Sequence, residues 1–174
     1  QAGFRYEHEF FDYYNAGRLV AEQSKDYSHL FPSVSFSFPI KEVKVQLGYS
    51  SDINRPSYNQ LRSSIFYANR YMYEKGNPFL MPSIIHNVTL GSSYKWMNLY
   101  VGYSHVKDDI TNQTIAYSAT IGLFTLQNTP AYDRLVAVLN INPTIGFWIP
   151  QLSLSIQKQW YEGETPKGKT KFNK

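Results

Sequence analysis

Tyrosine and arginine side chains gather in one polar stretch of the chain, Arg55–Pro82. Aromatic rings stack on sugars or bases, and guanidinium groups hold anionic groups. The stretch therefore contains a candidate ligand-contact surface. The alternative is that the same aromatics pack the loop against its neighbours and bind nothing. The residues of the candidate surface are Arg55, Tyr58, Arg62, Tyr67, Arg70, Tyr71 and Tyr73.

A second motif, Gly163–Thr170, matches the glycine-rich pattern that binds phosphate groups. That loop holds phosphates only where a helix follows its lysine and threonine within a parallel sheet. Only 171–174 remain after this motif, and the strands before it are expected to be antiparallel. We interpret the match as a basic surface loop and expect no nucleotide or other cofactor.

Metal ligands are sparse. Strand alternation would place His8 on the face opposite Glu7 and Glu9, and the pair Asp108–Asp109 would need further oxygen ligands from elsewhere to hold calcium. The four histidines are far apart in the sequence: His8, His29, His86 and His105. We therefore predict no metal site.

Motifs of enzymes are also missing from the sequence. There is no cysteine, so a thiolate nucleophile or thiolate metal site is excluded. Neither a Gly-x-Ser-x-Gly elbow nor a His-Glu-x-x-His pattern occurs. We predict no catalytic residue and no enzymatic activity.

The composition is rich in aromatics. Fifteen tyrosines and eleven phenylalanines help to bring Phe, Trp and Tyr to 17% of the chain. Membrane barrels have a physical reason for such an excess, because aromatic girdles lie at both membrane surfaces. The net charge is +4, and the basic residues are scattered except in the tail 167–174. This distribution does not indicate a nucleic-acid surface.

Alternating segments separated by turns of very different lengths organise the chain. Ser33–Phe38 and Val43–Ser50 alternate apolar and polar residues and are joined by the tight reversal Pro39–Glu42. The next connection, Arg55–Pro82, is long. Short turns on one side and long loops on the other are typical of transmembrane β-barrels. No run approaches the roughly 20 apolar residues of a membrane helix.

The same pattern continues on both sides of these segments. We expect a polar loop at Asn15–Ser28, an interfacial aromatic at Trp96, and a bulge at Asn140–Pro143 because proline removes a ladder donor. The tail Gly163–Lys174 is expected to begin another loop. Further strands are predicted at Gly3–Tyr14, Ile85–Tyr94, Leu99–Ser104, Gln113–Thr120, Leu123–Asn128, Asp133–Ile145 and Leu152–Gln157. The expected fold is all-β, an antiparallel meander of about seven or eight strands.

Alternation also assigns the two faces of this sheet. Small and polar residues such as Gln46, Gly48 and Ser50 suit a watery lumen or contact with a plug. The opposite face is apolar, and its lipid-facing candidates are Val34, Phe36, Phe38, Val43, Val45, Leu47 and Tyr49.

Together these features resemble the C-terminal barrel of TonB-dependent outer-membrane receptors, and within them the outer-membrane β-barrel family abundant in Bacteroidetes. Such receptors commonly show a Gly-Asn-Pro-x-Leu-x-Pro-Glu stretch before a descending strand. Here Ser83 replaces the usual Glu, and Met81 stands where a basic residue is frequent. The residues that carry the resemblance are Leu30–Ser35, Gly48–Ser50, Asn54–Tyr58, Tyr71–Leu80 and Pro82.

The resemblance implies a location in the bacterial outer membrane and a role in uptake of a glycan, a peptide or a metal chelate. It implies as partners the membrane lipid, a plug domain, the remaining barrel strands and, indirectly, the TonB system. Residues 1–174 are expected to form one all-β region without a plug domain. About seven strands cannot close a barrel of roughly 22 strands, so the chain is expected to be a fragment whose isolated sheet is open or re-paired.

One further fold is compatible with the alternation. A soluble, secreted β-sandwich could bind carbohydrate through exposed tyrosines. Such a sandwich requires the apolar faces of two sheets to pack into one core.

Overall fold

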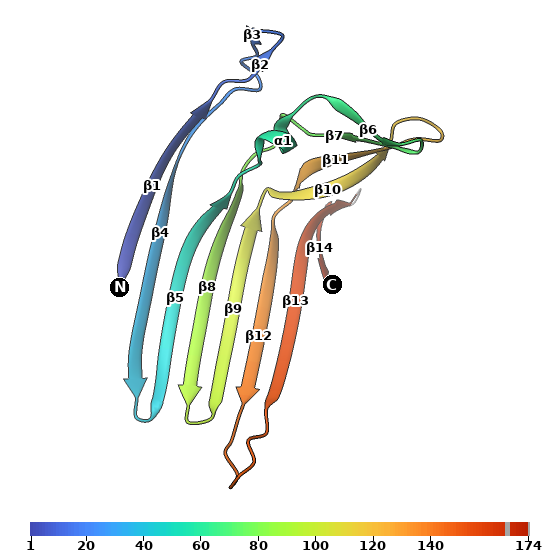
Figure 1. Cartoon of the computed structure of the whole chain (residues 1–174). Helices are drawn as coiled ribbons and strands as arrows, with labels where there is room; N and C mark the ends of the chain where they lie inside the picture. Colours follow the sequence, from blue (N-terminus) through green and yellow to red (C-terminus); the bar gives the residue numbers. More distant parts are fainter. Residues whose placement is uncertain (166–167, 174) are drawn as a thin grey trace.

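The computed structural model describes residues 1–165 and 168–173. Eight antiparallel strands form one sheet in the order β1-β4-β5-β8-β9-β12-β13-β14 (Figure 1). Their bounds are β1 (Ala2–Phe11), β4 (Lys25–Ile40), β5 (Val43–Asn54), β8 (Ser83–Tyr94), β9 (Met97–Lys107), β12 (Tyr132–Ile141), β13 (Leu152–Thr165) and β14 (Gly168–Asn173). The sheet is open, with β1 and β14 at its edges. The all-β antiparallel meander predicted from the sequence is confirmed.

Tight turns join strands at one end of this sheet. Lys41 (φ 54°) and Lys95 (φ 49°) occupy the left-handed region that two-residue hairpin turns require. They connect β4 to β5 and β8 to β9. The third connection at this end, 142–151 between β12 and β13, is longer. At the opposite end the connections from β1 to β4, from β5 to β8 and from β9 to β12 are long (Figure 1).

Strict alternation gives the sheet two chemically distinct faces. Phe36 lies opposite Leu47, which in turn lies opposite Leu90, and this row belongs to the apolar face. Gly48 lies opposite Thr89 on the polar face. The apolar face includes Val34, Phe36, Phe38, Val43, Val45, Leu47, Tyr49, Val88, Leu90, Leu99, Val101, Leu139, Leu154 and Ile156.

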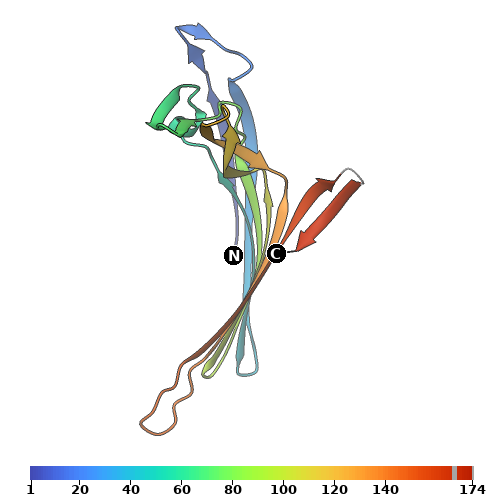
Figure 2. The ribbon, with the colours of Figure 1, turned by 90° about the vertical axis from the view of Figure 1, so that its right-hand side faces the viewer.

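The apolar face is uncovered. Phe36 is 61% exposed, Leu47 41% and Ile156 73%. Seen along its edge, the long sheet is a single layer (Figure 2). No second sheet packs on this face within the described part of the chain, so the sandwich considered from the sequence is wrong. Alternation alone could not separate the two folds, because it fixes which side is apolar but not what covers it.

A smaller sheet lies beyond the end with the long connections (Figure 1). Its strand order is β10-β11-β7-β6, and β11 pairs with β7 in parallel. The one-turn helix α1 (Tyr58–Leu61) precedes it, and a separate two-stranded hairpin joins β1 to β4. The strand bounds are β6 (Ile65–Asn69), β7 (Met72–Lys75), β10 (Asp109–Ala116) and β11 (Gly122–Thr129), with β2 (Tyr14–Asn15) and β3 (Arg18–Leu19) in the hairpin.

Several predicted boundaries need correction, among them β10, which spans Asp109–Ala116 instead of Gln113–Thr120, and β13, which continues past Gln157 to Thr165. β4 begins at Lys25, inside the expected loop Asn15–Ser28. Its residues from Lys25 to Val34 each pair with a residue of β1, and the last pair is Lys25 with Phe11. The ladder extends β4 to Lys25, whereas β1 ends at Phe11, before the expected Tyr14. β12 ends at Ile141, so the expected bulge around Pro143 lies beyond the strand. There the proline ends the ladder instead of interrupting it.

The C-terminal region also differs from the expected loop. Glu164 pairs with Lys169 in the antiparallel hairpin of β13 and β14. The phosphate-binding pattern therefore falls on a hairpin, without the parallel strand and following helix that its chemistry needs. Pro166, Lys167 and Lys174 lie outside the described residues. No helix in the described ranges is both long and apolar enough to span a membrane.

Candidate functional site

Gly76 shapes the long loop between β5 and β8. A Cβ atom at this position would lie 2.5 Å from the carbonyl oxygen of Gln60 and 2.7 Å from that of Arg62. Only glycine allows this close approach to backbone atoms. The next residue uses it, since the Asn77 N–H donates to the Gln60 oxygen at 2.7 Å. The region after β7 is thereby fixed against α1.

The side chain of Asn77 ties this loop to the next one. Its Oδ1 accepts a hydrogen bond from the Phe79 N–H at 3.0 Å, and its Nδ2 donates to the Leu126 carbonyl of β11 at 3.0 Å. Leu80 and Ser83 close the segment and are 1% and 0% exposed. The glycine-asparagine-proline motif singled out in the sequence thus builds the loop architecture.

Asn128 makes the reciprocal link from β11. Its Oδ1 accepts from the Met81 N–H at 2.8 Å, while its Nδ2 donates to the carbonyls of Met81 at 2.8 Å and Asp108 at 2.7 Å. Together with the parallel pairing of β7 and β11, these bonds join the two long loops into one body. We call this body, α1 with β6, β7, β10 and β11, the outer cap.

Three tyrosines meet on the outer cap. Tyr73 lies directly opposite Tyr67 across β7 and β6, with ring centroids 6.1 Å apart. On its other side its ring meets that of Tyr117 edge-on at 5.2 Å. Tyr67 is 70% exposed and Tyr117 50%. This tyrosine cluster offers ring surface to solvent, although the sequence alone gave no reason to include Tyr117.

The predicted arginines have their own aromatic partners. The Arg62 guanidinium lies 3.6 Å from the centre of the Phe66 ring, and that of Arg70 lies 4.9 Å from the Tyr71 ring. Tyr58 projects from α1 and is 87% exposed. The structure therefore brings Tyr67 and Tyr73 together but does not gather all seven predicted residues into one site.

Arg55 points to the polar face of the main sheet. It forms ion pairs with Glu7 and Glu9 of β1, two strands away. Burial opposes its charge, but Glu7, Glu9 and the Tyr27 hydroxyl outweigh this and raise the pKa of Arg55 above its ordinary value. The guanidinium is thus held by acidic groups of the chain itself.

A second arginine extends this group of charges. Arg5 Nε lies 2.9 Å from Glu7, and Arg5 Nη2 lies 3.7 Å from Asp52 of β5. The Arg5 guanidinium also lies 5.0 Å from the centre of the Phe31 ring. We call Arg5, Glu7, Glu9, Asp52 and Arg55 the ion-pair cluster. It connects β1, β5 and the start of the long loop.

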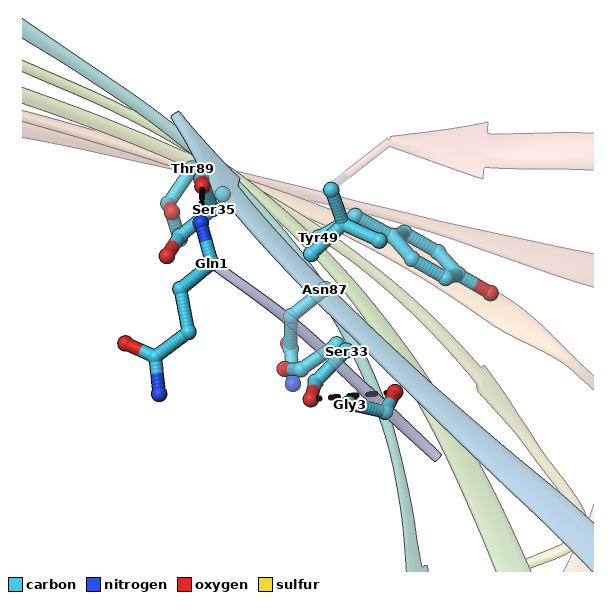
Figure 3. Close-up of a pocket in the computed structure, with 10 residues that line it drawn as sticks. Gln1, Gly3, Ser33, Ser35, Tyr49, Asn87 and Thr89 are labelled. Carbon is cyan, nitrogen blue, oxygen red and sulfur yellow. Dashed lines mark hydrogen bonds between the residues drawn. The ribbon is translucent and has the colours of Figure 1, made fainter. Parts of the chain in front are cut away.

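Small polar residues line a shallow recess further along the polar face (Figure 3). A Cβ atom at Gly48 would lie 2.6 Å from the Thr89 hydroxyl, so these two positions fit closely. In Figure 3, Ser33 and Asn87 lie on the side opposite to the Tyr49 ring. The recess offers backbone and short polar groups with little bulk. Its lining residues include Gly3, Ser33, Ser35, Gly48, Asn87 and Thr89.

The apolar face carries polar groups in one band, towards the outer cap. The Tyr49 hydroxyl lies 2.9 Å from His86 Nδ1. His105 Nδ1 lies 2.7 Å from Asp133, which also accepts from the Tyr103 hydroxyl at 2.8 Å. Within the described ranges, no three His, Asp or Glu side chains are arranged to hold a metal ion.

Comparison with known proteins identifies the architecture. Residues 1–174 match the sequence model of the outer membrane protein β-barrel family. The chain belongs to this family. No curated protein matches its sequence closely.

Solved structures similar to this barrel-family chain are much longer. The siderophore receptor PirA from Pseudomonas aeruginosa is 14% identical, with a TM-score of 0.63 over 84% of this chain and 33% of the receptor. The copper transporter OprC is 12% identical, with a TM-score of 0.58 over 93% and 30%. The ferric enterobactin receptor PfeA from Pseudomonas aeruginosa is 15% identical, with a TM-score of 0.54 over 78% and 26%. The chain thus spans about a third of their length or less, and the expected resemblance to a receptor barrel is confirmed at the level of the fold.

Membership of the barrel family places the chain in the outer membrane and assigns the two faces. The apolar face meets lipid, and the polar face lines the lumen. β9 has 11 residues, which agrees with the roughly 9–11 residues of a tilted membrane strand. The short turns are periplasmic and the outer cap is extracellular. Tyr49 and Tyr103 lie on the apolar face towards the outer cap, and Tyr94 and Trp96 lie at the periplasmic end, where an aromatic girdle is expected.

Proposed function

We propose that this chain is part of the barrel of a TonB-dependent outer-membrane receptor that imports a nutrient and performs no catalysis. The whole protein would contain a plug domain and further strands that close the barrel. Energy for uptake would come from the TonB system. Candidate nutrients are a glycan, a peptide and a metal chelate. The similarity in fold to the siderophore receptor PirA and the ferric enterobactin receptor PfeA supports the last class.

The open, two-faced sheet carries this proposal. Its lipid-facing side chains are exposed, and the strands β1 and β14 lie at free edges. Unpaired edge strands and an uncovered apolar face are unfavourable in water. Further strands that complete a barrel would pair with the free edges, and a bilayer would cover the apolar face.

The polar recess supports a role for the plug. Gly3, Gly48 and the short side chains around them leave room for another segment to approach the lumen wall closely. Donors and acceptors at Ser33 and Asn87 face that space. We assign the recess to contact with the plug of the complete receptor.

The tyrosine cluster supports a role in first contact with the nutrient. Tyr67, Tyr73 and Tyr117 present ring faces and hydroxyl groups on the extracellular side. Such rings stack on the apolar faces of sugars and on aromatic or planar groups of chelates. Arg62, Arg70, Tyr71 and Tyr58, elsewhere in the same long loop, would be secondary contacts. Arg55 holds the start of the loop through its ion pairs, and nutrient contact is assigned to the other predicted residues.

Uptake by the full-length receptor tests this function. Cells that carry the receptor would be offered labelled glycans, peptides and metal chelates, with and without a working TonB system. We expect uptake of one class that stops when TonB is removed. Uptake that persists without TonB, or no uptake of any class, would contradict the proposed function.

A matched pair of variants tests the contact surface. Tyr73→Ala should weaken nutrient binding about three- to tenfold, because an aromatic contact contributes about 0.5–1.5 kcal/mol. Tyr6→Ala removes a tyrosine that is 66% exposed on the lipid-facing side of β1, and it should leave affinity unchanged. Equal affinities for both variants and the wild type would remove the tyrosine cluster from the binding site.

A further inference from the structure

The periplasmic connection between β12 and β13 differs from the other two periplasmic turns among the described residues. The others each place two residues between paired strand ends, and they contain Lys41, Glu42 and Lys95. Lys95 Nζ lies 3.2 Å from Glu42, so an ion pair joins these two turns. The third connection, 142–151, contains no charged residue and extends further than the others (Figure 1).

The tip of this connection is an ordered hairpin. The Ile145 N–H donates to the Trp148 carbonyl at 2.8 Å, and the Trp148 N–H donates to the Ile145 carbonyl at 3.0 Å. Gly146 has φ +62°, a conformation that favours glycine at the turn. This geometry presents Phe147, Trp148 and Ile149 outwards.

The tip is strongly apolar and open. Phe147 is fully exposed, Trp148 is 60% exposed and Ile149 is 58% exposed. Such a concentration of large apolar side chains indicates a surface that is covered in the working protein. We call Ile145, Phe147, Trp148 and Ile149 the apolar tip.

The apolar tip continues the lipid-facing surface. Ile141 and Leu152 form the last pair of β12 and β13 on the apolar face, and they directly flank the connection 142–151. Leu152 and Leu154 are about half exposed on the same face. From Leu135 to Gln157 the chain contains no charged residue. An uncharged surface thus runs from the membrane-spanning strands into the tip.

We propose that the apolar tip anchors this side of the barrel in the periplasmic leaflet of the outer membrane, with Phe147 and Trp148 at the level of the lipid headgroups. Tryptophan is enriched at that level because its ring is apolar and its N–H is polar. Barrel strands tilt by roughly 35–45°, so a hairpin that prolongs them leans along the membrane surface. The occupant is lipid, and the charged turns at Lys41 and Lys95 remain in water.

Spin labels in the full-length receptor test the anchor. The receptor, with any other cysteines replaced, would be reconstituted in vesicles of phosphatidylethanolamine and phosphatidylglycerol. One label would be attached at Phe147→Cys, whose side chain has no packing to lose. Controls would carry it at Phe36→Cys, on the lipid-facing surface, and at Glu42→Cys, in a charged turn. Collision rates with oxygen, which partitions into lipid, and with a water-soluble nickel chelate would be measured for each.

We expect the label at position 147 to collide more with oxygen than with nickel, as the label at position 36 does. Behaviour like that of position 42, with frequent nickel collisions, would overturn the proposal and leave the tip in the periplasm. Low collision rates with both reagents would also overturn it, because they would show that protein covers the tip. All three labelled receptors should unfold under the same conditions as the unlabelled receptor, which would confirm that folded barrels are compared.

Discussion

Arg55, the first residue after β5, forms an ion pair with Glu7, which lies 48 residues earlier in the chain on β1. β4 lies between the two strands, so the contact spans β4 on the lumen-facing side of the sheet. Glu9 completes the pairing from the same face of β1. The long extracellular loop is therefore fixed at its first residue to a strand that is not its neighbour in the sheet.

Replacing this arginine should release the start of the loop. In the full-length receptor, Arg55→Met removes the arginine from Glu9 and leaves Glu7 with Arg5 alone, and we expect several-fold faster proteolysis within 55–82. Arg55→Lys should restore only part of the protection, because lysine cannot hold two carboxylates with a planar fork. Limited proteolysis of intact cells would measure this. Unchanged cleavage in Arg55→Met would show that the outer cap holds the loop without the ion pairs.

Gly76 gives a prediction for loop architecture. Gly76→Ala forces a Cβ atom against the carbonyls of Gln60 and Arg62, and we expect a loss of about 1–3 kcal/mol in the stability of the outer cap. Gly91→Ala is the matched control, because its nearest neighbouring atom would lie at 3.8 Å. Hydrogen exchange of 58–82 would report the change. Equal exchange in the two variants would disprove the close approach at Gly76.

The two faces of the sheet predict opposite responses to charge. Leu47 lies mid-strand on the lipid-facing side, and Leu47→Lys should destabilise the folded receptor by about 2–4 kcal/mol, the cost of lysine near the bilayer midplane. Its neighbour Gln46 faces the lumen, so Gln46→Lys should change stability much less. Urea unfolding in vesicles distinguishes the two. A larger effect at Gln46 would reverse the assignment of faces.

The ion pair between periplasmic turns predicts a pH dependence. Hydrogen bonds to Tyr94 and then to Glu42 raise the pKa of Lys95 above a lysine's ordinary 10.5. A raised pKa means that the folded state binds the proton more tightly, so the stabilisation is complete below the unfolded value and is lost above the folded one. The stability difference between wild type and Lys95→Met should thus be constant well below pH 10.5, the ordinary lysine pKa, and shrink as the pH rises above it. A difference that has already disappeared well below this pKa would contradict this.

Alternation carried most of the fold information in this sequence. It identified the lipid-facing residues from Val34 to Tyr49 because the side-chain period of a strand is two and both faces had clear chemistry. The tight turns followed from the short gaps between alternating segments. The resemblance supplied the family, and the match over the whole chain confirmed it.

Sequence could not give the contacts that depend on distant pairing. Tyr117 contacts Tyr73 only because β11 pairs with β7 in parallel, and no local sequence pattern predicts this pairing. The partner of Arg55 likewise depends on the order of strands in the sheet. The sequence therefore predicted only a loop and two strand extensions where the outer cap lies. The polar residues of this region have a structural role, because the side-chain amides of Asn77 and Asn128 join the two loops.

That joining has a consequence for transmission across the membrane. Because Asn77 and Asn128 make one solid piece of two loops, a molecule that presses on either loop displaces both. The piece connects directly to four adjacent strands of the barrel wall, β5, β8, β9 and β12. A displacement of the outer cap would therefore act on these strands together, whereas two independent loops would move separately.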